Sequence, residues 1–124
     1  MLLAAGANVN AKMKQMPDTA LMWAARRGHE DIVELLIAAG ANVNLKEKFS
    51  LLGTALADAV YFGHTSVVKL LLEAGADVNV ECLNRAALTI ALKNGHTEIA
   101  ALLRAAGAKE STKYTKLLDE IDYT

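Results

Sequence analysis

The feature that most constrains this chain is a five-residue segment that recurs with a nearly constant spacing. The segment at residues 40–44, Gly-Ala-Asn-Val-Asn, has a copy at residues 6–10, a variant at 75–79 and an incomplete copy at 107–108. The glycines that open these copies are 34, 35 and 32 residues apart. A Gly-His pair keeps the same phase at residues 28–29, 63–64 and 95–96. A period of about 33 residues indicates a stacked-repeat protein, in which each unit buries its apolar face against the next.

Each unit carries the signals of two short helices and an extended finger. In the first full unit, Thr19 is suited to cap a helix, because its hydroxyl accepts a hydrogen bond from an unpaired backbone N–H. The apolar side of that helix comprises Leu21, Ala24 and Ala25. Gly28 is expected to end the helix, since glycine adopts the left-handed conformation without steric cost. A second apolar pattern at residues 32–37 predicts another helix that ends at Gly40, followed by an extended segment to about residue 53.

This succession of motifs resembles the ankyrin repeat over residues 1 to about 108. The motif Thr-x-Leu-x-x-Ala-x-x-x-Gly-His begins at Thr19 and at Thr54, and Ile-Val-x-Leu-Leu follows at residues 32–36. The resemblance implies an all-α, ankyrin-type solenoid of helix–turn–helix repeats with short extended fingers. The family's usual Thr-Pro-Leu-His segment is altered in every unit, and Ala86 replaces the threonine in the third. The first helix of the third unit is therefore expected to be the least well anchored.

We predict a single domain over residues 1–124. It comprises a partial repeat at 1–9, full repeats at 10–43, 44–78 and 79–108, and a C-terminal capping helix at 109–124. The capping helix is expected because apolar residues recur at helical spacing along one side of this tail; the alternative is the first helix of a truncated fourth repeat. Residues 1–5 match the last turn of a second helix whose first helix is absent. Apolar surface at that end favours a monomer or weak self-association through the N-terminal end.

Composition and spacing argue against several classes of function. With 13 basic and 14 acidic residues, the net charge of −1 lacks the excess typical of nucleic-acid binding. The apolar runs are too short to span a membrane. Cys82 is the only cysteine and has no histidine near it in sequence, so neither an internal disulfide nor an activated thiol is expected. This cysteine content favours a reducing, cytoplasmic location.

No cofactor or metal site is expected. His29, His64 and His96 hold the same phase in successive repeats, which places them about 10 Å apart, too far to share one zinc ion. We expect them to hydrogen bond the turns of adjacent repeats together. Asn10, Asn44 and Asn79 carry amides that both donate and accept, which suits a link between successive fingers. No acid and base residues form a catalytic constellation, so we predict that the protein is not an enzyme.

The candidate binding surface follows from the resemblance, which implies that partners bind at the fingers and at the exposed side of the first helices. The two residues before each Gly-His pair differ between repeats, so stacking would align cationic, aromatic and cationic pairs. These residues are Arg26, Arg27, Tyr61, Phe62, Lys93 and Asn94. Aromatic and arginine side chains are enriched among residues that dominate binding energy. The alternative is that they are ordinary helix ends, with Phe62 packed on a neighbour.

Trp23 and Asp58 complete the candidate set. Asp58 holds the phase that Trp23 occupies in the first full repeat and Ile90 in the third. A carboxylate between two apolar positions needs water or a charged partner, because burying it unpaired is costly. Arg26, Arg27 and Lys93 are the available cations.

The predicted function is therefore recognition of a protein partner through the concave helix face and the fingers, without catalysis and without a nucleic-acid or membrane partner. One alternative is that the chain is a recognition fragment of a larger multidomain protein or enzyme. Another is that it is an engineered ankyrin scaffold. The identity of the partner does not follow from a fold that serves as a general binding platform.

Overall fold

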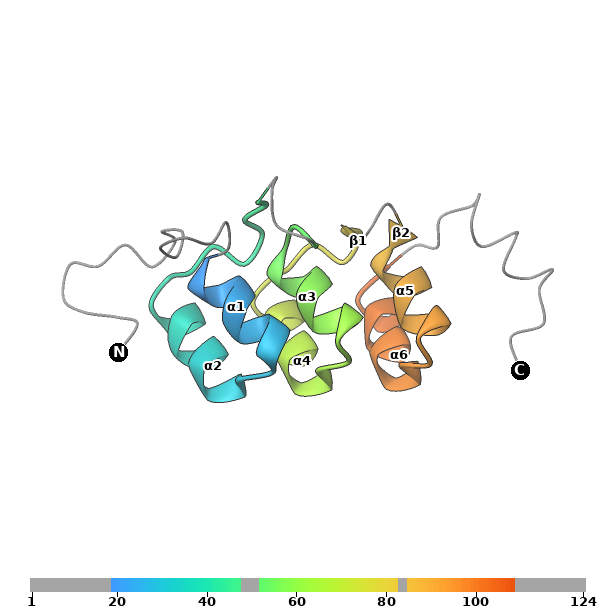
Figure 1. Ribbon diagram of the computed structural model, residues 1–124, viewed down its shortest axis with the longest axis horizontal. Helices are drawn as coiled ribbons and strands as arrows, with labels where there is room; N and C mark the ends of the chain where they lie inside the picture. Colours follow the sequence, from blue (N-terminus) through green and yellow to red (C-terminus); the bar gives the residue numbers. More distant parts are fainter. Residues whose placement is uncertain (1–18, 48–51, 83–84, 109–124) are drawn as a thin grey trace.

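The computed structural model describes residues 19–47, 52–82 and 85–108. Three helix pairs lie side by side along its long axis (Figure 1). The pairs are α1 (Ala20–Arg27) with α2 (Glu30–Ala38), α3 (Ala55–Tyr61) with α4 (Thr65–Glu73), and α5 (Ala87–Lys93) with α6 (Thr97–Ala105). Figure 1 shows α1, α3 and α5 in one row, here the inner helices, and α2, α4 and α6 in a second row, the outer helices. The predicted helix–turn–helix solenoid is confirmed.

The inner helices begin where the sequence predicted. The Thr19 hydroxyl accepts a hydrogen bond from the Met22 N–H at 3.3 Å, and the Thr54 hydroxyl accepts one from the Ala57 N–H at 3.1 Å. Ala86 has the same extended backbone at the start of α5, but its methyl group makes no such bond. The first two inner helices are thus capped by side chains and the third is not.

Glycines follow the helices as expected. Gly28 follows α1 with φ at 73°, and its N–H donates to the carbonyl oxygen of Ala25. Gly40 lies just past the end of α2 with φ at 92°. A side chain at either site would be strained, because L residues rarely adopt this conformation. The glycines therefore set the length of each helix.

The core is one continuous apolar layer within and between the helix pairs. Each inner helix buries an alanine completely at the same phase, Ala24, Ala59 and Ala91. These small side chains let neighbouring inner helices approach closely. The outer helices bury larger residues at one phase, Leu36, Leu71 and Leu103. Each repeat therefore contributes its apolar side to a shared core, as stacked repeats require.

Leu35 departs from the pattern expected for the second apolar helix. Its side chain is 58% exposed, although Leu70 and Leu102 at the same phase are half-buried. Both α4 and α6 pack against a preceding outer helix, whereas α2 is the first outer helix among the described residues. Burial at this phase thus depends on the neighbouring repeat, and α2's own sequence does not fix it.

The described parts of the fingers contain short antiparallel pairing. Strand β1 (Glu81–Cys82) pairs with β2 (Arg85–Ala86) in the third finger, with Glu81 opposite Ala86. In the second finger, the Glu47 N–H donates to the Gly53 carbonyl at 2.9 Å. The partial repeat at residues 1–9, the capping helix at 109–124 and most of the segment expected to self-associate lie outside the described residues.

Candidate functional site

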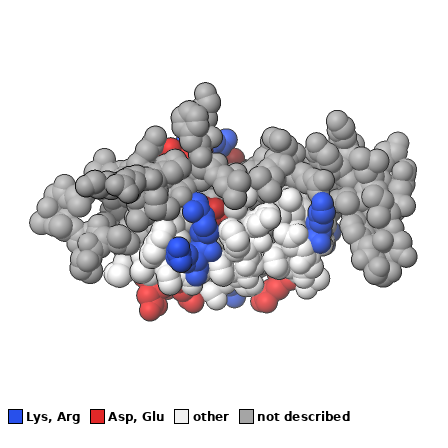
Figure 2. Space-filling model, viewed as in Figure 1, with Lys and Arg blue, Asp and Glu red and all other residues white. Residues whose placement is uncertain are grey.

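Three pairs of side chains stand at the ends of the inner helices. The pairs are Arg26 with Arg27, Tyr61 with Phe62, and Lys93 with Asn94, and together they are called the inner row. Because α1 packs against α3, and α3 against α5, the pairs follow one another across the stack. Arg26 and Tyr61 are half-buried and the other four side chains are exposed. Figure 2 shows Lys and Arg side chains in two groups on this face, over α1 and over α5, with mainly uncharged surface between them.

At the first end of the inner row, an arginine lies over an indole ring. The Arg27 guanidinium is 5.5 Å from the centre of the Trp23 ring, which is within the range of a cation–π interaction. Trp23 also contacts His29, with ring centres 5.2 Å apart. Trp23 is half-buried, so it packs against Arg27 while part of its own side chain stays accessible.

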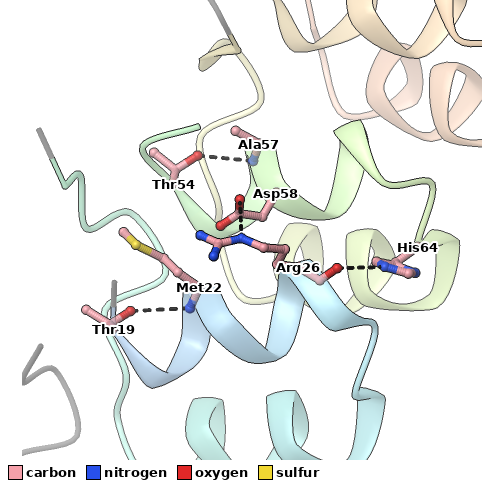
Figure 3. A network of polar contacts seen from close by, with 7 residues as sticks. All are labelled: Thr19, Met22, Arg26, Thr54, Ala57, Asp58 and His64. Atoms are coloured by element: carbon pink, nitrogen blue, oxygen red, sulfur yellow. Dashed lines mark hydrogen bonds and ion pairs between the residues drawn. The ribbon is translucent and has the colours of Figure 1, made fainter. Parts of the chain in front are cut away.

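Asp58 lies beneath the inner row. Its carboxylate is fully buried, and its Oδ1 atom is 3.4 Å from the Nε atom of Arg26 in the preceding repeat (Figure 3). Of the three cations considered from the sequence, Arg26 supplies this partner. Because the Asp58 side chain has no exposed surface, Asp58 is not carried into the proposed binding surface as a direct contact. Asp58 instead orients Arg26, whose side chain keeps 26% of its surface exposed.

The middle of the inner row is aromatic. Tyr61 and Phe62 lie edge to face, with ring centres 5.0 Å apart and planes inclined at 72°. Phe62 is 45% exposed and, with Leu35, is one of the two large apolar side chains exposed among the described residues. Phe62 thus packs on Tyr61 and still keeps nearly half of its surface accessible. A partly exposed aromatic pair between cations is suited to bind an apolar side chain of a partner.

Two histidines of the Gly-His pairs, His64 and His96, face the preceding repeat, and His64 makes the hydrogen bond between repeats that was expected of these residues. The Nε2 atom of His64 is 2.9 Å from the Arg26 carbonyl oxygen in the preceding repeat (Figure 3). The same imidazole faces Gly28, where a Cβ atom would come within 2.6 Å of Nδ1. His96 faces Gly63 in the same way, with its Cε1 atom 2.7 Å from the place of a Cβ.

Among the described residues, no group of three or more His, Cys, Asp or Glu side chains could hold a metal ion.

The fingers are linked by Asn44. Its side-chain N–H donates to the Gly75 carbonyl at 3.1 Å, and its Oδ1 accepts from the Asp77 N–H at 2.6 Å. This confirms the expected link between successive fingers at Asn44, whereas Asn10 lies outside the described residues. Cys82 lies in β1, and its side chain is not among those described.

A hollow lies beside the inner end of the second and third fingers, and sequence reasoning missed it. Its described lining is Lys46, Glu47, Leu52, Gly53, Thr54, Asn79 and Val80. The lining residues come from two successive repeats, so no local pattern in either segment marks the hollow.

Within the described ranges, every helix is too short or too polar to cross a membrane.

Comparison with known proteins agrees with this architecture. A family model for ankyrin repeats, three copies long, matches residues 1–82 and 51–114. Together the two matches cover nearly the whole chain. No curated protein matches the sequence significantly.

Proposed function

Because this chain belongs to the ankyrin-repeat family, we propose that it binds a protein partner through the inner row and the adjacent fingers, without catalysis. Ankyrin repeats are in general modules of protein–protein interaction. The observation that carries the proposal for this particular surface is the exposed aromatic pair. Phe62 is exposed and held edge to face against Tyr61, in the middle of a row whose other members are basic or polar.

Few other surfaces of the described repeats expose aromatic or large apolar side chains. The outer helices expose mainly charged and small residues, and their one large exposed apolar side chain among the described residues is Leu35. Trp23, Tyr61 and Phe62 all belong to the inner helices or their ends. Aromatic side chains supply large contact areas at low entropic cost, which is why they dominate many binding surfaces.

The proposal is tested by selecting ligands from a random-peptide display library and measuring their affinity for variants. Changing Tyr61 and Phe62 to alanine should weaken binding by more than about 1 kcal/mol, because side chains of this type commonly contribute that much. Leu35→Ala is the matched control, since it removes an exposed apolar side chain from an outer helix. If Leu35→Ala weakens binding and the double variant does not, the binding surface lies on the outer helices.

The double variant is expected to stay folded, because Phe62 is 45% exposed and Tyr61 is half-buried. Leu71→Ala provides the reference for a true core defect. Leu71 is fully buried, and such truncations cost about 2–5 kcal/mol of unfolding free energy. A loss of binding with a far smaller loss of stability than Leu71→Ala assigns the effect to the surface.

A further inference from the structure

The nearly neutral composition hides a separation of charge between the two rows of helices. The inner helices carry three basic residues, Arg26, Arg27 and Lys93, and one acidic residue, Asp58, which is fully buried. The outer helices carry five acidic residues and two basic ones. Accessible charge on the inner helices is thus entirely positive, whereas the outer helices are mainly negative. Figure 2 shows this separation as blue groups on the viewed face and red groups along its lower edge.

The two arginines at the first end of the inner row are held by contacts with other side chains, whereas the lysine at the other end is exposed to solvent. Arg26 is oriented by the buried Asp58 carboxylate, and Arg27 lies over the Trp23 ring. Lys93 is exposed at the end of α5 and forms no ion pair with the described residues. Between these ends lie Tyr61 and Phe62, which carry no charge. An occupant that complements this surface has negative groups at both ends and an apolar group in the middle.

We propose that the inner row binds an acidic peptide segment of a partner protein in an extended conformation. The proposal rests on the proposed function and adds the chemistry of the partner. Two steps between stacked helices span about 20 Å, at about 10 Å a step. An extended chain advances about 3.3 Å per residue, so acidic residues about six positions apart would reach both ends. An apolar side chain midway between them would lie on the aromatic pair.

A protein segment fits this surface better than a nucleic acid. The inner helices offer three cations, of which two share one repeat. Nucleic-acid interfaces commonly neutralise about 6–10 phosphates, and their affinity depends mainly on that number. The aromatic pair in the centre of the row gives an apolar side chain a place that a phosphate backbone would not use.

The test uses the full chain and the peptides selected from the random library. The selected sequences are expected to be rich in aspartate and glutamate on both sides of an apolar residue. A fluorescent copy of the best peptide should bind at least about tenfold more weakly to Lys93→Glu, because the substitution places like charges together. Lys69→Glu is the matched control: it makes the same charge change at an exposed position of outer helix α4, and it should leave the affinity within about twofold.

The outcomes separate this inference from the function on which it rests. Selected peptides without an acidic excess, whose binding is lost with Tyr61 and Phe62 but unaffected by Lys93→Glu, would overturn the acidic partner and leave the binding function standing. Equal effects of Lys93→Glu and Lys69→Glu would also overturn it, because only overall charge would then matter. A single-stranded oligonucleotide that binds more tightly than the peptides, with the same dependence on Lys93, would replace the partner by nucleic acid. Failure to enrich any peptide on this face would contradict the proposed function itself.

Discussion

Arg26 of the first described repeat is paired with Asp58 of the second, with 3.4 Å between Nε and Oδ1. The two ends of this ion pair differ in environment, because Asp58 is fully buried and the Arg26 side chain is 26% exposed. Removing the cation leaves a carboxylate in the interior, whereas removing the carboxylate leaves a guanidinium that can reach water. Loss of Arg26 should therefore destabilise the protein more than loss of Asp58.

Arg26→Met should lower the free energy of unfolding by about 3 kcal/mol, because it removes the cation that is paired with a buried carboxylate while keeping an aliphatic side chain. Asp58→Asn should lower it by only about 1 kcal/mol, the usual net value of one hydrogen bond. Urea denaturation followed by circular dichroism measures both. The double variant should lose less than the two single losses combined, because the partners interact. A larger loss for Asp58→Asn than for Arg26→Met would show that other contacts of the carboxylate dominate.

Gly28→Ala should be more destabilising than Gly40→Ala. Both glycines have a left-handed backbone, with φ of 73° and 92°, so each substitution brings a strain of about 1–2 kcal/mol. At Gly28 a Cβ would also meet the His64 ring at 2.6 Å, whereas nothing lies within 4 Å of a Cβ at Gly40. Overpacking of this kind adds about 1–3 kcal/mol. Thermal denaturation of both variants tests the difference.

His64→Ala is the control for that comparison. In its background the ring that meets the new Cβ is gone, so the gap between Gly28→Ala and Gly40→Ala should narrow. A gap that persists in the absence of the imidazole would mean that the backbone around Gly28, and not the contact with the next repeat, accounts for the extra loss.

Replacement by valine should destabilise the protein at one buried threonine, Thr54, but not at another, Thr89. The Thr54 hydroxyl caps α3, so Thr54→Val should cost about 0.5–2 kcal/mol. Thr89 is 1% exposed and its Oγ1 atom has no hydrogen-bond partner among the described residues, so Thr89→Val removes a buried polar group without changing the side chain's shape. Such a change should be neutral or raise the unfolding free energy by about 1 kcal/mol. Destabilisation by Thr89→Val in a denaturant titration would indicate that its hydroxyl is satisfied in solution.

Ala86→Thr should stabilise the third described repeat. Ala86 already has the extended backbone of a capping residue, with φ at −60° and ψ at 143°, but lacks the hydroxyl that Thr19 and Thr54 provide. A threonine there could accept from the N–H of residue 89, with a gain of about 0.5–2 kcal/mol. Hydrogen exchange resolved by helix should show the gain mainly in α5. Ala86→Ser is a useful companion, since it adds the hydroxyl with less bulk.

The sequence was sufficient to predict features that depend on contacts within a repeat. Thr19 and Gly28 act on backbone groups a few residues away, so their roles follow from local spacing. The link through Asn44 also followed, because the segments at residues 40–44 and 75–79 present asparagine and backbone groups at the same phase. Regular stacking thus made some contacts between repeats predictable.

The parts that the sequence did not predict depend on which residues face one another across repeats. Asp58 occupies a phase held elsewhere by Trp23 and Ile90, and its fully buried carboxylate is paired with an arginine that the preceding repeat contributes. A carboxylate at an apolar phase, with cations in the repeats on either side, was the available signal, but Arg26, Arg27 and Lys93 all satisfied it. The exposure of Leu35 and the hollow beside the fingers likewise depend on neighbours and not on local periodicity.

The contacts of the Gly-His pairs give the stack a direction. The imidazole of His64 lies against Gly28, and that of His96 lies against Gly63. Each of these glycines thus forms a socket for the histidine of the repeat that follows. No side chain lies within 4 Å of a Cβ built at Gly95, which leaves this socket unfilled by the described residues. A repeat transplanted into this array must therefore carry both halves of the joint, its glycine for the successor and its histidine for the predecessor. Units that keep both halves can be exchanged or inserted without redesign of this contact.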